Sequence, residues 1–302
     1  MLALLFAASV TLHGTWSAVV SGDRVHLNMV RDDSNWGTTY PRSDFALSDS
    51  DVNSATEKPV AFALKRDAGT IDFTGTFQNG EGVGRFNFTP NPEFAATLRS
   101  LGVNSEEPLD DEQLFRLAMH GITTAFIRDM QSLGYHENLD TYIRFRIHGV
   151  TPEFIRDMNQ LGYKPDAEDA VRFRIHGVTP QFVRDMRDAG YSSVPAEELV
   201  RFRIHGVSPQ FVHDLRDLGY TSLSSDDLVR FRIHGVSPEF VRELRDLGYS
   251  SVSADDLVRF RIHGVTADFI RELATAGYHN IPPDKLVQMK IRGLDPVSLR
   301  NQ

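Results

Sequence analysis

The stretch of residues 226–254 reads DDLVRFRIHGVSPEFVRELRDLGYSSVSA, and the same pattern begins again at Asp255. The His of its His-Gly pair recurs every 28 or 29 residues, at His120, His148, His176, His205, His234 and His263. A fixed period of this size is the signature of a protein built from stacked repeats. The pattern therefore predicts six repeats, which begin at Glu112, Asp140, Glu168, Glu197, Asp226 and Asp255.

The second half of the repeat has the pattern of a short helix. Ser237 precedes Pro238, and a hydroxyl cap followed by Pro at the first helical position is a typical helix start. Apolar residues follow at helical spacing, at Phe240, Val241, Leu244 and Leu247. Gly248 comes next and predicts the end of the helix.

The first half of the repeat fits two structures. As a helix, residues 253–256 would form a capping box, Gly264 would end it, and an apolar arc would contain Leu257, Val258, Phe260 and Ile262, with Arg261 inside it. As a strand, the last three of these apolar residues would alternate with polar ones. We expect a helix, because the cap and the glycine bracket the segment and Leu257 breaks the alternation. Two short helices per repeat must stack on their neighbours to bury their apolar faces.

One Tyr recurs in each linker between repeats, at Tyr135, Tyr163, Tyr191, Tyr220, Tyr249 and Tyr278. We expect this ring to pack as a spacer with its hydroxyl at the surface. Stacking against a ligand is the alternative interpretation.

Residues 12–90 have a different residue pattern, which is typical of antiparallel strands. Five segments alternate or are β-rich, and a longer irregular insert at residues 32–59 separates the second from the third. Asn79-Gly80 between the last two predicts a tight hairpin. A small sheet or half-barrel fits this pattern, and its apolar face must be covered by another element.

The remaining segments complete an α+β chain: a small N-terminal antiparallel β-sheet domain followed by an α-helical solenoid. Residues 91–111 copy the second half of a repeat and are expected to link and cap the array, which spans residues 112–283. Residues 284–302 form a C-terminal capping partial repeat, in which Asp295-Pro296 begins a last helix. Residues 1–11 are a remnant signal segment or a first strand, because residues 1–10 resemble the apolar region of a secretory signal peptide but lack a preceding positive charge. We therefore expect an extracytoplasmic location, periplasmic or secreted, with a cytoplasmic one as the alternative.

The composition and the absence of known motifs exclude several classes of function. The 302 residues carry a net charge of −9, which argues mildly against a nucleic-acid partner. There is no Cys, so disulfides, thiolate metal sites and Cys nucleophiles are excluded. The chain contains neither a G-x-S-x-G nucleophile motif nor a phosphate-binding loop nor the H-E-x-x-H zinc motif. We expect no enzyme activity and no cofactor; an unrecognised site around Trp16, His26, Trp36 and Asp44 is the least supported alternative. We expect instead that Trp16 is buried in the core and that Trp36 lies in an exposed loop.

The six His in register suggest a metal site, but successive repeats lie roughly 10 Å apart in a stack, too far to share one ion. We expect each His at a helix C-terminus, where the helix dipole favours it. An Arg pair also recurs, at Arg144/Arg146, Arg172/Arg174, Arg201/Arg203, Arg230/Arg232 and Arg259/Arg261. The second Arg of each pair falls inside the apolar arc. We expect it to pair with an acid of the second helix, at Asp129, Asp157, Asp185, Asp214, Glu243 or Glu272. The first Arg is then a candidate for partner binding. The candidate partner-binding residues are Arg144, Arg172, Arg201, Arg230 and Arg259, with His148, His176, His205, His234 and His263.

The motif H-G-V-[TS]-P-[EQ]-F-[VI]-R-[DE]-[LM]-x-x-x-G-Y, as in residues 176–191, resembles repeats in the extracytoplasmic C-terminal regions of bacterial BlaR1/MecR1-like sensor proteins of the M56 family. Residues 14–17 and 82–88 resemble the sheet segment that precedes those repeats. The membrane helices and the H-E-x-x-H of the peptidase part are absent from this sequence, so the resemblance carries over no catalytic residue. It implies a sensor or interaction region outside the cytoplasm.

Together these patterns predict a non-enzymatic scaffold that binds a protein or peptide. A solenoid that binds nucleic acid or another polyanion through its Arg rows is the alternative, and phosphate contacts would make its affinity fall steeply with salt.

Overall fold

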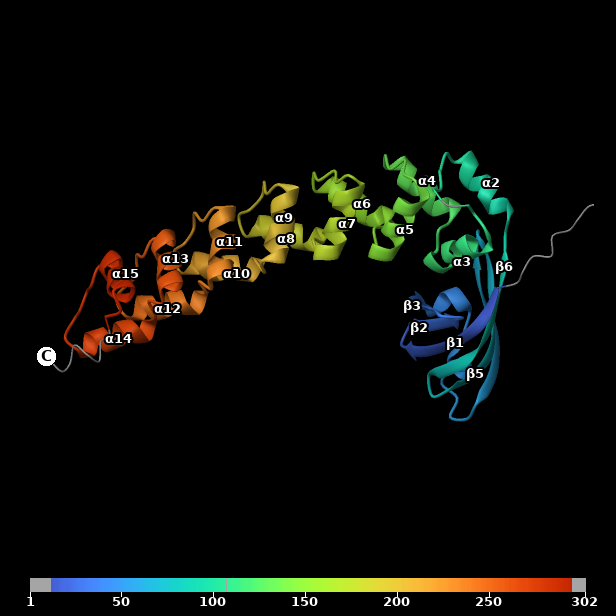
Figure 1. The fold of residues 1–302 in the computed structure, drawn as a ribbon, viewed down its shortest axis with the longest axis horizontal. Helices are drawn as coiled ribbons and strands as arrows, with labels where there is room; N and C mark the ends of the chain where they lie inside the picture. The colour runs from blue at the N-terminus through green and yellow to red at the C-terminus, as the bar shows by residue number, and fades with distance from the viewer. Residues whose placement is uncertain (1–11, 107, 295–302) are drawn as a thin grey trace, which may run out of the picture. The chain divides into compact units, whose positions relative to one another are not determined.

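Six strands form one antiparallel sheet in the order β3-β2-β1-β6-β5-β4. The computed structural model describes residues 12–106 and 108–294, and Figure 1 shows this sheet followed by the helical repeats. The strands are β1 (Leu12–Ser21), β2 (Arg24–Arg31), β3 (Ser34–Pro41), β4 (Lys58–Arg66), β5 (Gly69–Gln78) and β6 (Glu81–Pro90). The predicted hairpin at Asn79-Gly80 joins β5 to β6, with positive φ angles of 51° and 84° at the two turn residues. The predicted fold class is confirmed.

The sheet contains one strand more than the sequence predicted. The expected irregular insert includes β3, the 3-10 helix η1 (Arg42–Phe45) and the short helix α1 (Asp49–Val52). β3 reads SNWGTTYP and pairs with β2 at the edge of the sheet, where a strand needs little apolar alternation. The prediction that Trp36 lies in an exposed loop was wrong for the same reason: Trp36 is half-buried on β3.

The core of the sheet is built around Trp16, which is buried as predicted. Its indole Nε1 donates hydrogen bonds to the backbone oxygens of Thr74, at 3.2 Å, and Arg85, at 3.1 Å. Gly75 and Gly84 face each other on β5 and β6, and a Cβ on either would lie within 3 Å of the indole. The two glycines therefore make the space that the indole fills.

The apolar face of the sheet is covered, as expected, by other elements: η1, which lies between β3 and β4 in the sequence, and a helix that follows the sheet. Helix α3 (Asp111–His120) inserts Phe115, whose ring lies 5.6 Å from Phe86 and 5.4 Å from Trp36, measured between centroids. Phe45 of η1 lies 5.4 Å from Tyr40 on β3 and 5.6 Å from Phe62 on β4. The 3-10 helix thus joins the two edge strands. Helix α2 (Glu93–Ser100) forms where the linking segment was predicted.

The chain divides into two compact units, Met1–Arg156 and Asp157–Gln302. The first unit contains the sheet, α4 (Thr124–Ser132) and α5 (Leu139–His148), and α6 (Pro152–Gln160) crosses the boundary. The second unit contains α7 (Ala167–His176), α8 (Pro180–Asp188), α9 (Ala196–Ile204), α10 (Pro209–Asp217), α11 (Ser225–His234), α12 (Pro238–Asp246), α13 (Ala254–His263), α14 (Ala267–Thr275) and α15 (Pro283–Ile291). The predicted leader at residues 1–10 and the helix expected at Asp295-Pro296 lie outside the described residues.

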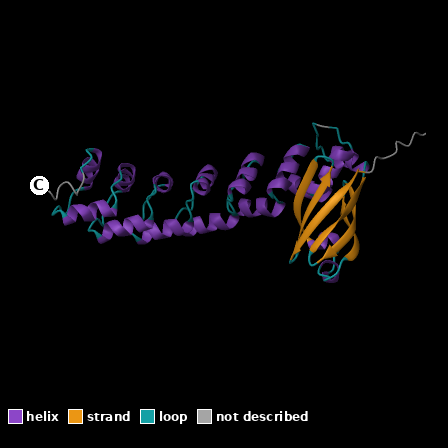
Figure 2. Ribbon diagram, turned by 60° about the horizontal axis from the view of Figure 1, so that its bottom comes forward, coloured by secondary structure: helices purple, strands orange, loops and turns teal. Residues whose placement is uncertain are grey.

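Both halves of the repeat are helical, so the strand alternative for the first half is excluded. Ser224 begins α11 with a capping box that it shares with Asp227, and Gly235 ends the helix in the left-handed conformation. Ser237 and Pro238 begin α12 as the sequence predicted. Within the second unit each first helix contacts the first helix of the next repeat, and the second helices α8, α10, α12 and α14 do the same (Figure 2).

Four of the linker tyrosines, Tyr163, Tyr191, Tyr220 and Tyr249, form hydrogen bonds that connect one repeat to the next. The Tyr191 hydroxyl donates to the backbone oxygen of Leu223 at 2.6 Å, and the Tyr220 hydroxyl donates to that of Val252 at 2.7 Å. Burial raises the pKa of both tyrosines. For Tyr163, Tyr191, Tyr220 and Tyr249 the expected packing role is present, but the prediction of a hydroxyl at the surface was wrong, because each hydroxyl completes a hydrogen bond between repeats. Tyr278, in the last linker, is 46% exposed.

Candidate functional site

The second arginine of each pair holds the stack together. Arg203 donates from Nε to the backbone oxygen of His176 at 3.3 Å, and its guanidinium carbon lies 5.0 Å from the centroid of the Phe182 ring. Arg232 makes the corresponding contacts with His205 and Phe211 of the preceding repeat. The prediction of an acidic partner on the second helix was wrong for these residues. A carbonyl and an aromatic face replace the carboxylate.

The first arginine of each pair lies among carboxylates. Arg201 contacts Glu198 of its own helix at 2.7 Å and Asp226 of the next repeat at 2.9 Å. Arg230 and Arg259 repeat the arrangement, each with one acid on its own helix and one on the next repeat. Their side chains remain 37–43% exposed. The row is therefore a ladder of alternating charges. Arg172 pairs with Asp169 of its own helix, and Arg144 lies exposed on α5 of the first unit.

The candidate histidines lie at the C-terminal ends of first helices, as predicted. His148, His176, His234 and His263 are the last residues of their helices, and His205 is a C-cap. Over the described part of the chain, no group of three or more His, Asp or Glu side chains is placed to hold a metal ion.

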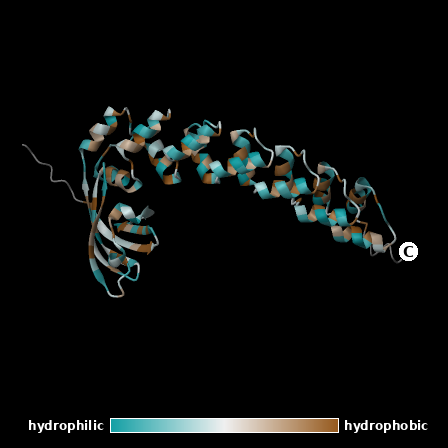
Figure 3. Ribbon diagram, turned by 180° about the vertical axis from the view of Figure 1, so that it is seen from behind, coloured by the Kyte–Doolittle hydropathy of each residue, from teal (hydrophilic) through white to brown (hydrophobic). Residues whose placement is uncertain are grey.

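A row of exposed isoleucines runs beside the charged ladder, and the sequence had placed it in the core. Each Ile directly precedes the repeat's His or, at the end, Arg292. The isoleucine row of the second unit consists of Ile175, Ile204, Ile233, Ile262 and Ile291, which are 53–63% exposed. Figure 3 shows apolar and polar positions alternating along the repeat helices.

Helix geometry explains the error. At 100° per residue, Arg261 lies roughly 40° and Ile262 roughly 140° around the helix axis from Leu257. The buried residues Leu257, Val258 and Phe260 centre the packed face close to Leu257, so Arg261 lies much nearer to that centre than Ile262 does. The isoleucine is therefore left on the margin, on the side of the first-arginine ladder.

The first repeat buries this same position. Met119 stands where later repeats carry the isoleucine, and it is only 2% exposed. Tyr40 of β3 covers it, with its hydroxyl donating to the Met119 backbone oxygen at 2.7 Å. In the next repeat Ile147 is 51% exposed. The fold itself thus contains one example of a protein surface docked on this face.

The residues of the alternative enzyme site do not converge. Trp16 is in the sheet core, whereas Trp36 packs against Phe115. His26 Nδ1 lies 3.0 Å from the Thr39 hydroxyl on the solvent-exposed side of β2. Asp44 forms an ion pair with Arg66.

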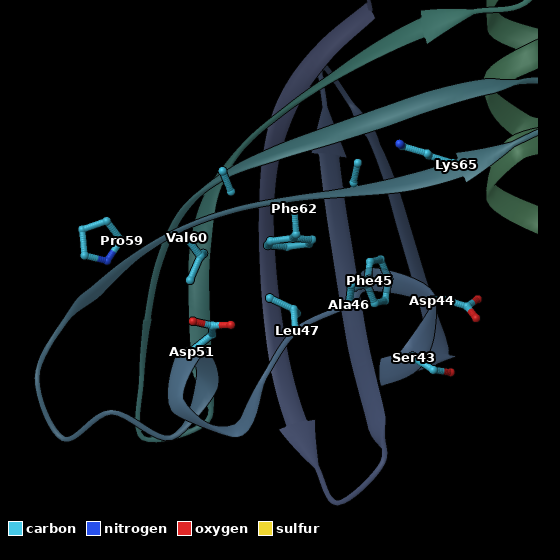
Figure 4. A pocket seen from close by; sticks show the side chains of 12 residues that line it. Ser43, Asp44, Phe45, Ala46, Leu47, Asp51, Pro59, Val60, Phe62 and Lys65 are labelled. Atoms are coloured by element: carbon cyan, nitrogen blue, oxygen red, sulfur yellow. The ribbon is translucent and has the colours of Figure 1, made fainter.

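A pocket of about 560 Å³ lies beside η1 and β4 (Figure 4). Two carboxylates line it, Asp44 and Asp51. Hydrogen bonds from Ser48 and Lys58 lower the pKa of Asp51, and its carboxylate also closes the capping box of α1. Both carboxylates thus take part in local ion pairs and hydrogen bonds.

Comparison with protein-family models and with curated proteins finds no match. Among the described helices, none combines the length and apolar character needed to cross a bilayer.

Proposed function

We propose that this chain is a non-enzymatic repeat scaffold that binds a polypeptide partner along the isoleucine row of its second unit. The observation that carries the proposal is the regular exposure of one isoleucine per repeat. Single exposed apolar side chains are common, but larger exposed apolar patches mark interaction sites, and here one large apolar side chain recurs at the same position of successive repeats. Burying the exposed part of each would contribute on the order of 1 kcal/mol to binding.

The spacing of the row indicates the partner's chemistry. Neighbouring helices pack roughly 10 Å apart. Two turns of an α-helix advance about 10.5 Å, so an amphipathic helix with an apolar residue at every seventh position matches the row. The docking of Tyr40 on Met119 supports an apolar or aromatic side chain as the occupant of each step.

The charged ladder favours a protein over a polyanion. Arg201, Arg230 and Arg259 are each already paired with two carboxylates. A polyanion would meet those acids as well as the arginines, and repulsion would offset the attraction. Alternating charges instead match a polypeptide that carries both signs, and they give specificity at the rim of an apolar contact.

An extracytoplasmic sensor or interaction region is the cellular context that we propose. It rests on the apolar residues 1–10 and on the resemblance to the repeats of M56-family sensor proteins. An envelope extract is therefore the first source in which to seek the partner.

The test compares the full chain with a variant that carries Ile204→Ser, Ile233→Ser and Ile262→Ser. Each purified protein captures partners from envelope extract at low and at moderate salt, and a peptide with Leu at every seventh position competes. We expect the parent protein to capture one polypeptide at both salt concentrations. The competing peptide should displace that polypeptide, and the triple variant should fail to capture it. The control is Val83→Ser, because Val83 is 60% exposed on the sheet of the first unit.

Equal capture by the triple variant would refute the isoleucine row as the binding site. Nucleic acid that is captured at low salt and released at moderate salt would favour the polyanion alternative.

A further inference from the structure

A polar cleft lies within the first unit, between the edge strand β3 and the C-terminal ends of α3 and α5. Its volume is about 770 Å³, and residues 37–41 of β3 form one wall. Met119, His120 and Ile147 contribute to the opposite wall. This size lies within the range of about 300–1,000 Å³ that is usual for ligand pockets.

The charges that line the cleft are unlike those of the chain as a whole. Arg24 of β2, Arg66 of β4 and Arg146 of α5 line it, and Asp44 is the carboxylate among the described lining residues. Three guanidinium groups against one carboxylate leave two positive charges, in a chain whose net charge is −9. A concave site with an excess of one sign concentrates ligands of the opposite sign.

All three guanidinium groups have partners before any ligand arrives, and that of Arg24 donates from Nη2 to the backbone oxygen of Thr39 on β3 at 3.5 Å. Arg146 donates from Nε to the backbone oxygen of His120 at 3.0 Å, and its guanidinium carbon lies 5.2 Å from the centroid of the Phe126 ring. Arg66 is anchored by Asp44. A guanidinium has five N–H donors, so these contacts leave donors for a ligand. Side chains that are already ordered lose less entropy on binding.

The surroundings of His120 indicate the same positive environment. Burial, followed by the charges of Arg116 and Arg146, lowers the pKa of His120 below its ordinary value of 6.5. The charged form of His120 is therefore disfavoured, and the positive charge of the cleft comes from the arginines.

The edge strand adds a second kind of contact. β3 pairs with β2 on one side, and its other side is the edge of the described sheet. Backbone groups along such an edge can pair with an extended peptide. The arginines come from three separate elements, which suits several separate carboxylates better than one compact phosphate.

We propose that this cleft binds a ligand with two or more carboxylate groups, which contact Arg24, Arg66 and Arg146 while the ligand lies along the edge of β3. The site belongs to the first unit and does not depend on the isoleucine row. The same chemistry is offered by an acidic peptide and by a small polycarboxylate.

Calorimetric titration of the full chain at low salt tests the proposal with triglutamate, triglutamine, citrate and inorganic phosphate. We expect binding of triglutamate or citrate, no binding of triglutamine, and weaker binding of phosphate. Binding of triglutamate above citrate identifies a peptide as the source, and the reverse order identifies a small molecule.

Two variants locate the site, one that removes a positive charge from the cleft and one that removes its negative charge. Arg24→Gln should weaken the binding by about fivefold, the effect of one exposed charge pair. Asp44→Asn should tighten it, because it removes the opposing carboxylate and releases Arg66; a variant that merely failed to fold could not bind more tightly. The control is Arg99→Gln, an exposed arginine on α2 that does not line the cleft.

Three results would overturn the proposal. They are absence of binding by triglutamate and by citrate, phosphate binding tighter than either carboxylate ligand, and binding to which Arg24→Gln and Asp44→Asn make no difference.

Discussion

Replacing Arg203 by Met tests whether the second arginine of the pair stabilises the stack, as the structure indicates. Met keeps much of the aliphatic stem but loses two contacts. One is the hydrogen bond to the His176 backbone oxygen at 3.3 Å, and the other is the guanidinium above Phe182 at 5.0 Å. A long hydrogen bond at a partly exposed site contributes about 1 kcal/mol, and an exposed cation–π contact contributes about 0.5–1 kcal/mol. The expected loss is therefore about 1.5–2 kcal/mol in the free energy of unfolding.

The assay is urea unfolding of the full chain, followed by helical circular dichroism. For a slope of about 2 kcal/mol per molar urea, the midpoint should fall by about 0.8–1 M. Both Trp residues lie in the sheet, so Trp fluorescence follows the first unit in the same samples.

The matched control is Arg201→Met, two residues earlier on the same helix. Arg201 makes two ion pairs, but it is 37% exposed, and at about 0.5 kcal/mol for each exposed pair the two together contribute about 1 kcal/mol. If Arg203→Met lowered the midpoint no more than Arg201→Met does, the stabilising role assigned to the carbonyl and ring contacts would be wrong.

Two further predictions concern other parts of the chain. Tyr220→Phe removes the hydrogen bond to Val252 and should cost about 1 kcal/mol near neutral pH. Because burial raises the pKa of Tyr220 above 10.0, this stabilisation is complete below that value and is lost as the pH rises through the raised pKa. Urea unfolding should therefore show a difference between parent and variant that shrinks at alkaline pH; a constant difference would contradict the assignment. Gly84→Ala should disrupt the sheet and shift Trp fluorescence to the red, since its Cβ would lie 2.0 Å from the Thr74 backbone oxygen, whereas Gly37→Ala meets its nearest atom at 3.7 Å and should be tolerated. Equal stability of the two glycine variants would refute this account.

Sequence signals that act locally predicted the structure of this chain better than those that depend on neighbouring elements. The period, the Ser-Pro helix starts and the glycine stops act within a few residues, and they correctly predicted the repeat and both of its helices. The Asn79-Gly80 hairpin was predicted for the same reason, because its turn geometry is local. β3 was missed because an edge strand lacks the strong apolar alternation by which strands are recognised.

The surface residues of the repeat required the tertiary structure. The sequence identified Ile262 and Arg261 as members of one arc, but it could not determine which of them faces the preceding repeat. Which of the two faces the preceding repeat depends on the direction in which neighbouring helices pack. The guanidinium of Arg261 lies over the ring of Phe240 in the preceding repeat. The isoleucine is consequently left at the surface.

The sequence by itself determined the repeat, its helices and most of the sheet, because periodicity, capping and turn chemistry operate over short distances. The cleft was decided by tertiary structure alone. Arg24, Arg66 and Arg146 are far apart in the chain, and no local motif links them. They share one cavity because the 3-10 helix η1 joins the two edge strands and α3 packs on the sheet, so their proximity depends on contacts between elements distant in sequence.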